Sequence, residues 1–368
     1  FSLSRTYNSV GASIHSMFGR GWSFEYDEAL SQLADGSIAY RRGDGSILPF
    51  TPDGNGGFTG PAGYGLSLSR IKTGEVTEDF GTEEDPDVQT FDVYEYEITS
   101  RDGTVRRFNS WGLLASITDI NGFTTALSYD AAYNLTGITT PSGKTFAIAL
   151  DENGMIRSVT LPDGGLVRYA YDAAGNLVSY FDALGNETKY IYDAAHRMTS
   201  WVDANGTAMV VNVYDEKGRV VEQTDGNGGV SKLAYEDGKT IATDAAGNIT
   251  VYHYDEQHRT TRIEYPDGTA ESFEYDAGNQ RSAFVDKLGN RTAYEYDAAG
   301  NFTKQTRFDG ASQTYTYNAQ NKPASFTDYA GKTTRYEYNE AGDMTAVIYN
   351  DGTQNTFTYD ANHNPITM

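Results

Sequence analysis

Carboxylates are the commonest side chains in this sequence that could do chemistry. There are 51 Asp and Glu residues, against 28 Lys and Arg and five His. Glycoside hydrolysis needs two carboxylates at a set separation, one of them in apolar surroundings. Most of these acids fall instead in polar, glycine-containing segments, where water keeps their pKa values ordinary. The sequence also lacks Gly-x-Ser-x-Gly, His-Glu-x-x-His and Gly-x-x-x-x-Gly-Lys motifs. We therefore assign no catalytic residue and predict that the chain is not an enzyme.

Metal and nucleic-acid chemistry are also disfavoured. The chain has no cysteine, which excludes thiolate metal sites and disulfides. Its acidic turns could bind calcium, but their spacing lacks the dense oxygen ligands of an EF-hand. Calcium stays an alternative, and we assign no metal and no cofactor. The net charge of −23 would repel phosphate backbones, so we expect no nucleic-acid partner. No apolar run is long enough to span a bilayer.

The acids belong to a repeat. A Tyr-Asp pair or a close variant recurs from position 108 to position 359, and ten of the twelve intervals between these anchors are 21 residues. Such a period is typical of a structural array in which each unit buries its apolar face against its neighbours. We call the tyrosine of each pair the anchor tyrosine. The complete pairs begin at Tyr129, Tyr171, Tyr192, Tyr214, Tyr254, Tyr275, Tyr296 and Tyr359.

Two turns in each repeat predict its fold. In the copy that starts at Tyr171, Gly175 and Gly185 follow the anchor by four and fourteen residues, which leaves room for two strands of about seven residues. Each repeat is then a β-hairpin, and successive hairpins pair edge to edge. The predicted fold is all-β: tandem hairpins form one long, spiralling antiparallel sheet, as an open arc or a partial hollow shell.

The position of Gly175 also explains three of the five histidines. Other repeats place His196, His258, His363, Asn279, Asn321 or Tyr133 there. Asn and His tolerate positive φ better than most residues, so this position is predicted to have a left-handed backbone. We interpret these histidines as turn residues. His15 and His253 lie elsewhere, and we interpret them as structural or exposed.

Aromatic residues two positions before the anchors complete the pattern. Tyr190 and Tyr192, for example, share one face of a strand, because residues two apart point the same way. We expect these pairs to stack into ladders along the sheet rather than to form a sugar-binding platform. The anchor aspartate, with Asn176, is predicted to accept hydrogen bonds from turn amides. The residues that we assign to the repeat framework are Tyr171, Asp172, Gly175, Gly185, Tyr190, Tyr192, Asp193, Tyr254, Asp255, Tyr275, Asp276, Tyr294, Tyr296, Asp297, Tyr315, Tyr317, Tyr336 and Tyr338.

The array starts late in the chain. We predict a β-rich N-terminal region over residues 1–107 that caps the sheet, and about twelve 21-residue hairpins over residues 108–368. The segment from Glu75 to Val88 is predicted to be an acidic loop. Because the sequence ends part-way into a repeat, we expect it to be a piece of a longer polypeptide.

The motifs now in hand resemble the RHS/YD-repeat family. The match is Tyr-Asp-Ala-Ala-Gly-Asn-Leu at 171–177, followed by Asp182-Ala183-Leu184-Gly185-Asn186 and Thr188-x-Tyr190-x-Tyr192-Asp193. The opening, with Ser4-Arg5-Thr6-Tyr7 and Phe18-Gly19-x-Gly21-Trp22, is similar to the domain that commonly precedes these repeats. The resemblance covers nearly the whole chain.

The resemblance implies a hollow shell in a large, exported bacterial protein, secreted or at the cell surface. Such a shell holds a C-terminal toxin domain of the same polypeptide, which is absent from this sequence, and meets secretion or translocation components. The family's Asp-Pro-x-Gly-Leu cleavage motif is also absent, so self-cleavage is not carried over. The alternative function is an extracellular adhesion or glycan-binding module, with carbohydrate as its partner.

Overall fold

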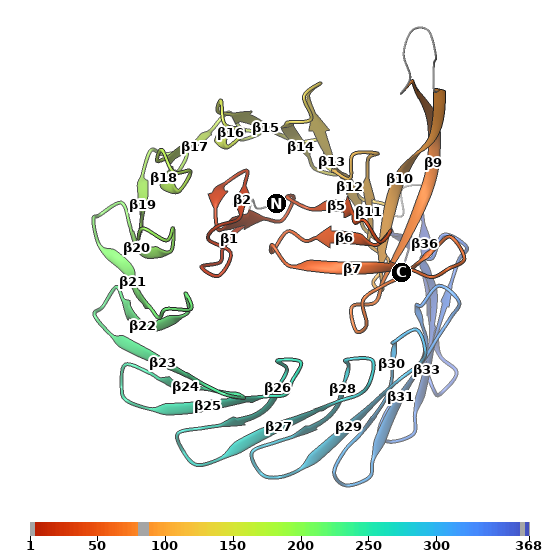
Figure 1. The fold of residues 1–368 in the computed structure, drawn as a ribbon. Helices are drawn as coiled ribbons and strands as arrows, with labels where there is room; N and C mark the ends of the chain where they lie inside the picture. The colour runs from red at the N-terminus through yellow and green to blue at the C-terminus, as the bar shows by residue number, and fades with distance from the viewer. Residues whose placement is uncertain (1–3, 80–87, 361–364, 368) are drawn as a thin grey trace. The chain divides into compact units, whose positions relative to one another are not determined.

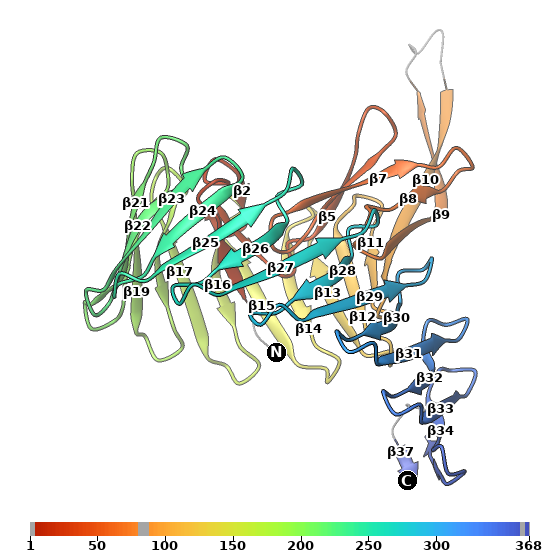
Figure 2. The same ribbon diagram turned by 90° about the horizontal axis from the view of Figure 1, so that it is seen from below.

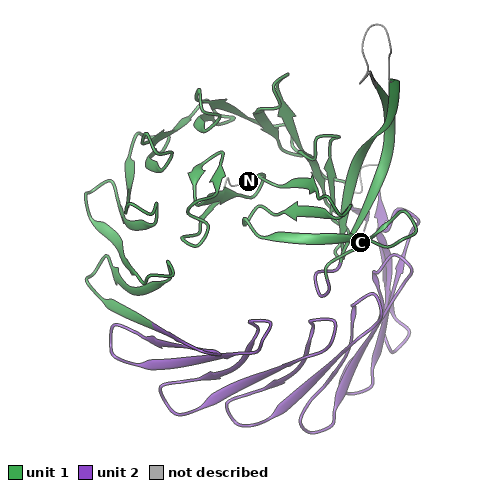
Figure 3. Cartoon of the chain, viewed as in Figure 1, with its two compact units in different colours: residues 1–61, 66–233 green, residues 62–65, 234–368 purple. Residues whose placement is uncertain are grey.

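The computed structural model describes residues 4–79, 88–360 and 365–367, and all regular structure in them is β. These residues contain no helix, and so none that could cross a membrane. The chain divides into two compact units (Figure 3). Unit 1 holds residues 1–61 and 66–233, and unit 2 holds residues 62–65 and 234–368.

One antiparallel sheet contains the 27 strands from β9 to β35, and each strand pairs with the next along the chain. The predicted edge-to-edge pairing of hairpins is thereby confirmed. In unit 1 the sheet strands are β9 (Leu66–Asp79), β10 (Val88–Ser100), β11 (Val105–Phe108), β12 (Leu114–Thr118), β13 (Thr124–Tyr129), β14 (Leu135–Thr139), β15 (Thr145–Leu150), β16 (Ile156–Thr160), β17 (Leu166–Tyr171), β18 (Leu177–Phe181), β19 (Glu187–Tyr192), β20 (Met198–Val202), β21 (Ala208–Tyr214), β22 (Val220–Asp225) and β23 (Val230–Glu236), which ends in unit 2.

Unit 2 continues the same pattern of short strands. Its sheet strands are β24 (Lys239–Thr243), β25 (Ile249–Tyr254), β26 (Thr260–Glu264), β27 (Ala270–Tyr275), β28 (Arg281–Val285), β29 (Arg291–Tyr296), β30 (Phe302–Thr306), β31 (Ser312–Tyr317), β32 (Pro323–Thr327), β33 (Thr333–Tyr338), β34 (Met344–Ile348) and β35 (Gln354–Thr356). A separate ladder pairs β36 (Thr358–Tyr359) with β37 (Pro365–Thr367).

The two turns of a repeat share one geometry. After β17, the N–H of Asp172 donates to the carbonyl of Asn176 and the N–H of Gly175 to the carbonyl of Asp172, both at 3.0 Å. Gly175 has φ 83°, the left-handed backbone that closes a three-residue hairpin loop. The second turn, from Asp182 to Asn186, repeats both bonds at 3.0 Å.

The left-handed position is confirmed where a side chain replaces the glycine. Every non-glycine residue of positive φ in the described part of the chain occupies it, with φ between 57° and 64°. These residues are Tyr133, His196, His258, Asn279 and Asn321. His363 lies outside the described residues. The turn chemistry of the repeat therefore follows from local backbone preference.

Residues 4–61 form small sheets that lie on one face of the large sheet in unit 1. Figure 1 shows the strands of unit 1 curving around them. They supply Phe18, Phe24 and Phe50 to a core completed by Ile138 and Leu177 of the large sheet, all at most 1% exposed. Their strands are β1 (Arg5–Tyr7), β2 (His15–Ser16), β3 (Gly19–Arg20), β4 (Trp22–Phe24), β5 (Ala29–Gln32), β6 (Ile38–Arg41), β7 (Ile47–Pro52) and β8 (Phe58–Thr59).

One prediction about this N-terminal region was wrong. Glu75–Asp79 and Val88, which we assigned to an acidic loop, lie in β9 and β10. These two strands pair from Leu66 to Asp79 and from Val88 to Ser100, and the rest of the predicted loop, residues 80–87, lies outside the described residues. Alternation of Val76, Phe91 and Val93 with polar residues was the strand signal that the acidic composition concealed.

Candidate functional surface: the tyrosine face

Side chains of the anchor aspartates cap the first turn of each repeat. Asp172 accepts the N–H groups of Ala174 and Asn176 at Oδ1, at 3.0 and 2.9 Å, and the side-chain amide of Asn176 at Oδ2. This confirms the predicted role of the aspartate, whereas the side chain of Asn176 bonds the carboxylate of Asp172 and the ring of His196 rather than turn amides. Equivalent caps are formed by Asp193, Asp255, Asp276 and Asp297.

The capping hydrogen bonds favour the charged carboxylate. Hydrogen bonds from the side chain and backbone of Asn186 lower the pKa of Asp182 in the second turn. At Asp172, burial opposes ionisation, but the bonds from Asn176 outweigh it and the pKa is again lowered. These carboxylates are therefore ionised near neutral pH and occupied by amides. The geometry accounts for them without a catalytic or metal-binding role.

A β-bulge, which sequence reasoning missed, lies at the anchor tyrosine. Ala170 is opposite Ser179 but Tyr171 is opposite Leu177, so Val178 is an extra residue in β18. The same shift occurs before Tyr192, Tyr275 and Tyr296. Such a bulge interrupts the ladder locally and leaves a backbone group in need of another partner.

The hydroxyl of the next anchor tyrosine supplies that partner. Tyr192 donates to the carbonyl of Leu177 at 2.8 Å, and Leu177 is fully buried. Each such bond joins an anchor to the carbonyl at the first position of a strand in the preceding repeat, sixteen residues earlier for Tyr214 and Met198 and fifteen residues earlier in the other repeats. The other pairs are Tyr129–Leu114, Tyr171–Ile156, Tyr275–Thr260, Tyr296–Arg281, Tyr317–Phe302, Tyr338–Pro323 and Tyr359–Met344.

We call the side of the sheet that carries these rings the tyrosine face. The aromatic residue two positions before an anchor lies there too, and in four repeats it is directly opposite a second aromatic residue of the following strand. Tyr315 is opposite Phe326, with ring centroids 4.9 Å apart. Tyr169 and Tyr180, Tyr190 and Trp201, and Phe273 and Phe284 are paired in the same way. Sequence reasoning missed these partners, although an aromatic residue stands nine positions after each of the anchors Tyr171, Tyr192, Tyr275 and Tyr317.

The remaining framework residues differ in their partners across the strands. Tyr294 and Tyr315 both contact the ring of Phe302, with centroids 6.0 and 5.4 Å away. Tyr336 is half-buried in β33 and opposite Val347. Tyr254, at the end of the short repeat, donates its backbone N–H to the carbonyl of Gly238 at 2.8 Å. Gly185 has φ 87° in its turn.

In unit 1 the tyrosine face holds the N-terminal residues by side-chain hydrogen bonds. Trp22 Nε1 donates to the hydroxyl of Tyr192 at 2.9 Å. The hydroxyl of Tyr7 donates to the carbonyl of His196 at 2.8 Å and accepts the N–H of Met198 at 2.9 Å. Burial raises the pKa of Tyr7 to about 12 and that of Tyr192 further, so both phenols stay protonated and can donate.

A half-buried cation reinforces this contact. The guanidinium of Arg5 lies 4.4 Å from the ring centroid of Tyr180 and 5.3 Å from that of Tyr169, and Nη2 donates to the hydroxyl of Tyr190 at 2.9 Å. Trp22 places its ring 5.6 Å from the same group. Cation–π attraction strengthens as the two groups lose water, and Arg5 and Tyr180 are both half-buried. The tyrosine face thus binds polypeptide through aromatic rings and backbone-like polar contacts.

In unit 2 the same face contains a hollow of about 510 Å³ lined by Tyr275, Arg281, Tyr294, Tyr296 and Phe302. The aromatic residues around it are half-buried within the chain. The hydroxyls of Tyr275 and Tyr296 already donate to carbonyls. The hollow therefore offers mainly the faces of aromatic rings and the guanidinium of Arg281, because two of its tyrosine hydroxyls already donate to carbonyls.

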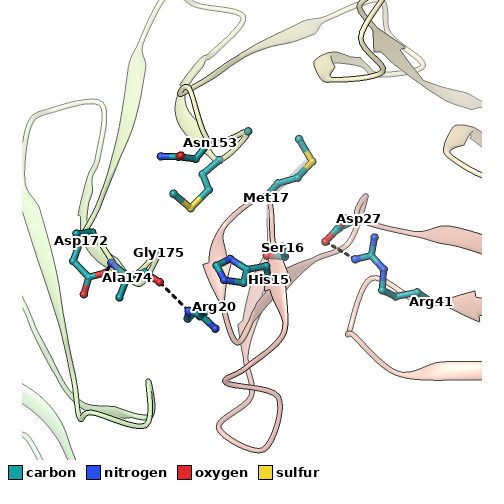
Figure 4. A pocket seen from close by; sticks show the side chains of 13 residues that line it. His15, Ser16, Met17, Arg20, Asp27, Arg41, Asn153, Asp172, Ala174 and Gly175 are labelled. Carbon is teal, nitrogen blue, oxygen red and sulfur yellow. Dashed lines mark hydrogen bonds and ion pairs between the residues drawn. The ribbon is translucent and has the colours of Figure 1, made fainter.

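A second cavity, of about 660 Å³, lies in unit 1 between the β2–β3 hairpin and two sheet turns (Figure 4). Arg41 pairs with Asp27 at 2.7 Å, and Arg20 donates to the carbonyl of Ala174 at 2.8 Å. His15 lies beside Gly175, and Asp172 caps its own turn. These contacts assign its charged groups to packing of the hairpin against the sheet. No cluster of metal-ligating side chains occurs among the described residues.

Comparison with known proteins agrees with this geometry. Residues 97–243 match the model of the Teneurin YD-shell, and residues 236–270, 275–314 and 317–354 match that of the RHS Repeat. The chain belongs to the RHS/YD-repeat family. Residues 1–50 match a domain of unknown function, DUF6531. The repeat part is thus a YD-shell-type sheet. No curated protein matches the sequence.

Solved structures share the fold at low identity. A crystal structure of TcdB2-TccC3-TEV has a TM-score of 0.52 and 12% identity, covering 90% of this chain and 23% of that one. The Photorhabdus luminescens Tc holotoxin pore has a TM-score of 0.54 and 12% identity, covering 94% and 24%. This chain spans about a quarter of the length of those chains. At such identities the likeness shows the fold alone.

Proposed function

We propose that this chain is a wall segment of a bacterial toxin-delivery shell, and that its tyrosine face encloses a polypeptide cargo. One observation carries the proposal: the face that holds residues 4–61 in unit 1 recurs in unit 2 with a hollow lined by four aromatic rings and an arginine. Its repeats are hairpins joined to one another by hydrogen bonds from each anchor hydroxyl to a carbonyl of the preceding repeat. Such a wall insulates cargo by shape and needs no reaction of its own.

The related solved structures support this assignment. They include a Tc holotoxin pore and TcdB2-TccC3 without its hypervariable C-terminal region, which matches 88% of this chain at 11% identity. By analogy, the cargo would be a C-terminal toxin segment of the same polypeptide, and the protein would be exported to the cell surface or beyond. The capping role of residues 1–107 stays a prediction. The structure places residues 4–61 on the tyrosine face and β9–β11 in the sheet.

The glycan-binding alternative is less well supported. Sugar platforms use exposed rings with hydroxyls free to bond the ligand. Here the anchor hydroxyls donate to main-chain carbonyls, as those of Tyr192 and Tyr317 do. The paired rings Tyr315 and Phe326 also lie 4.9 Å apart, which favours packing against each other.

Face-selective crosslinking tests the enclosing role. A destabilised reporter polypeptide is fused after Met368, and a photoreactive phenylalanine analogue replaces either Tyr315 on the tyrosine face or Thr316, the next residue of β31, on the opposite face. We expect crosslinks to the reporter from position 315 and few from position 316. Equal yields from both positions, or none from position 315, would contradict the proposal. A folded, compact reporter of the same length is the matched control and should not crosslink.

A further inference from the structure

In unit 1 the tyrosine face holds Arg5 in a cage of three aromatic side chains, Tyr169, Tyr180 and Tyr190, which we call the Arg5 cage. The guanidinium lies 4.4 Å from the ring centroid of Tyr180 and 5.3 Å from that of Tyr169, and it donates to the hydroxyl of Tyr190 at 2.9 Å. Arg5 Nε is buried and has no hydrogen-bond partner among the described residues. Ring faces and one hydroxyl therefore hold this cation.

The repeat register fixes the three positions of the cage. Tyr169 in β17 is directly opposite Tyr180 in β18, and Tyr180 is opposite Thr188 in β19. Tyr190 is two residues further along β19, so it lies diagonally across from Tyr180 on the same face. The cage is thus made by the residue two positions before one anchor, the residue nine positions after it, and the residue two positions before the next anchor.

The same three positions are aromatic again in unit 2, where Tyr315, Phe326 and Tyr336 form what we call the Tyr315 cage. Tyr315 in β31 is opposite Phe326 in β32, and the register of β32 with β33 places Tyr336 diagonally across from Phe326. Figure 2 shows these three strands side by side. The rings of Tyr315 and Phe326 are 4.9 Å apart at an interplanar angle of 31°, and the matching pair of the Arg5 cage is 5.6 Å apart at 38°. The two cages share one framework.

A third copy of the arrangement, also in unit 2, already contacts a cation. Phe273 is opposite Phe284 with ring centroids 5.5 Å apart, and Tyr294 stands at the third position. The guanidinium of Arg281 lies 4.7 Å from the ring centroid of Phe273. Two of the three cages are therefore in contact with an arginine of this chain, one from the N-terminal residues and one from the sheet itself.

The Tyr315 cage contains no such cation from the described residues. No lysine or arginine among them lies over the ring of Tyr315, Phe326 or Tyr336, and Lys322 lies 5.6 Å from the ring centroid of the anchor Tyr338 instead. The three side chains of the cage are half-buried, so their rings are not fully covered. This cage therefore has the framework of the Arg5 cage without its guanidinium.

Charge favours a cation as the occupant. The neighbouring positions on the tyrosine face are uncharged, because Gln313 lies two residues before Tyr315 and Thr334 is opposite Phe326. The chain as a whole carries a net charge of −23. A guanidinium would be attracted by this field, whereas carboxylates and phosphate groups would be repelled.

We propose that the Tyr315 cage binds an arginine side chain of the polypeptide that the wall encloses. The inference rests on the proposed enclosing function and adds the chemistry of one contact to it. The guanidinium lies over the ring of Phe326 and donates to the hydroxyl of Tyr336, as Arg5 does at Tyr180 and Tyr190. A planar guanidinium stacks on rings better than an ammonium does. Because the cage contacts only this group, it can hold cargo segments of differing sequence.

The test uses the full chain with a destabilised reporter polypeptide fused after Met368. A photoreactive phenylalanine analogue replaces Val347, which is opposite Tyr336 and outside the cage. Three reporters of equal length carry arginine, lysine or glutamine at the same positions. We expect the crosslink yield of the arginine reporter to exceed that of the glutamine reporter about threefold or more, with the lysine reporter between them.

Ring removal separates the cage from general attraction to an acidic wall. Phe326→Leu keeps an apolar side chain without the ring and should lower the arginine yield to the glutamine level. Tyr336→Phe removes only a hydroxyl and should lower the arginine yield without changing the glutamine yield. The matched control Phe284→Leu makes the first change at the equivalent position of the third copy and should leave all yields at position 347 unchanged. Hydrogen exchange of β31–β33 checks that each variant keeps its local fold, and Tyr336→Phe decides the test if Phe326→Leu does not.

The outcomes distinguish the cage from the enclosing function. Equal yields from the arginine and glutamine reporters would overturn the cage and leave enclosure intact, because crosslinks would still form. Absence of crosslinks with every reporter would overturn both. An arginine preference that persists in Phe326→Leu and Tyr336→Phe would overturn the cage, because net charge alone would then explain it. Self-association in sedimentation that Phe326→Leu abolishes would overturn it too, because the occupant would then be a second copy of this chain.

Discussion

Replacing Tyr192 with Phe removes one hydroxyl and keeps the ring. That hydroxyl donates to the carbonyl of Leu177 at 2.8 Å and accepts Trp22 Nε1 at 2.9 Å. Leu177 is 0% and Trp22 7% exposed, so two buried polar groups lose their partner together. Leaving a buried group unsatisfied costs about 1–3 kcal/mol. We therefore expect Tyr192→Phe to cost about 2–4 kcal/mol.

The matched control is Tyr338→Phe. Its hydroxyl donates to the carbonyl of Pro323 at 2.9 Å in an exposed setting, where water can replace it. We expect a loss below about 1 kcal/mol. Hydrogen exchange of the amides in β18 and β19, compared with those in β32 and β33, measures the local opening free energy at each site. Equal small losses of stability at both sites would refute the reasoning. They would show that the Tyr192 hydroxyl does not stabilise the contact between Trp22, the carbonyl of Leu177 at the bulge and the hairpin that carries Tyr192.

Three further predictions follow from the turns and from the N-terminal contact. His196→Gly should change stability by less than about 0.5 kcal/mol in thermal melts. Glycine removes the backbone strain of φ 63°, and this gain offsets the loss of the contact from His196 Nδ1 to Asn176. A loss above about 2 kcal/mol would indicate a specific site at His196. Hydrogen bonds lower the pKa values of Asp182, Asp203 and Asp286. Their contribution to stability is present above the unfolded pKa of about 3.9 and is lost as pH falls through the folded pKa values. The melting temperature should therefore drop below about pH 4, and it should drop less in the Asp182→Asn variant. Burial raises the pKa values of Asp27 and Glu28, whose contribution has the opposite sign and is lost as pH rises. Arg5→Lys should speed amide exchange in β1 and β4, at a cost of about 1–2 kcal/mol, because an ammonium cannot stack on Tyr180 as the guanidinium does; unchanged exchange would contradict this.

The local features of the fold could be predicted from the sequence. Gly175 and His196 mark the left-handed turn position because positive φ restricts residue choice directly. Asp172 signals its own turn because its side chain reaches amides two and four residues ahead. A fixed period then orders the hairpins, since each must pair with the next to bury its apolar face.

Features that depend on distant contacts could not be predicted in the same way. The Tyr192 hydroxyl donates to a carbonyl fifteen residues earlier, which a β-bulge leaves without a ladder partner. Neither the bulge nor the accepting carbonyl requires a particular residue type, so the sequence does not indicate them. Arg5 meets Tyr190 across 185 residues of chain. The end of β9 from Glu75 to Asp79 and the first residue of β10, Val88, were assigned to a loop because the acidic residues there lowered the apparent strand propensity.

The account depends most on one claim, that each strand presents alternate residues to a tyrosine face and to an opposite face. Because the chain has no cysteine, single cysteines can be placed at Lys189, Tyr190 and Ile191 in β19 and at Arg335, Tyr336 and Glu337 in β33, and their maleimide labelling rates measured. We predict fast labelling at 189, 191, 335 and 337 and much slower labelling at 190 and 336. Uniform rates along either strand would contradict the claim.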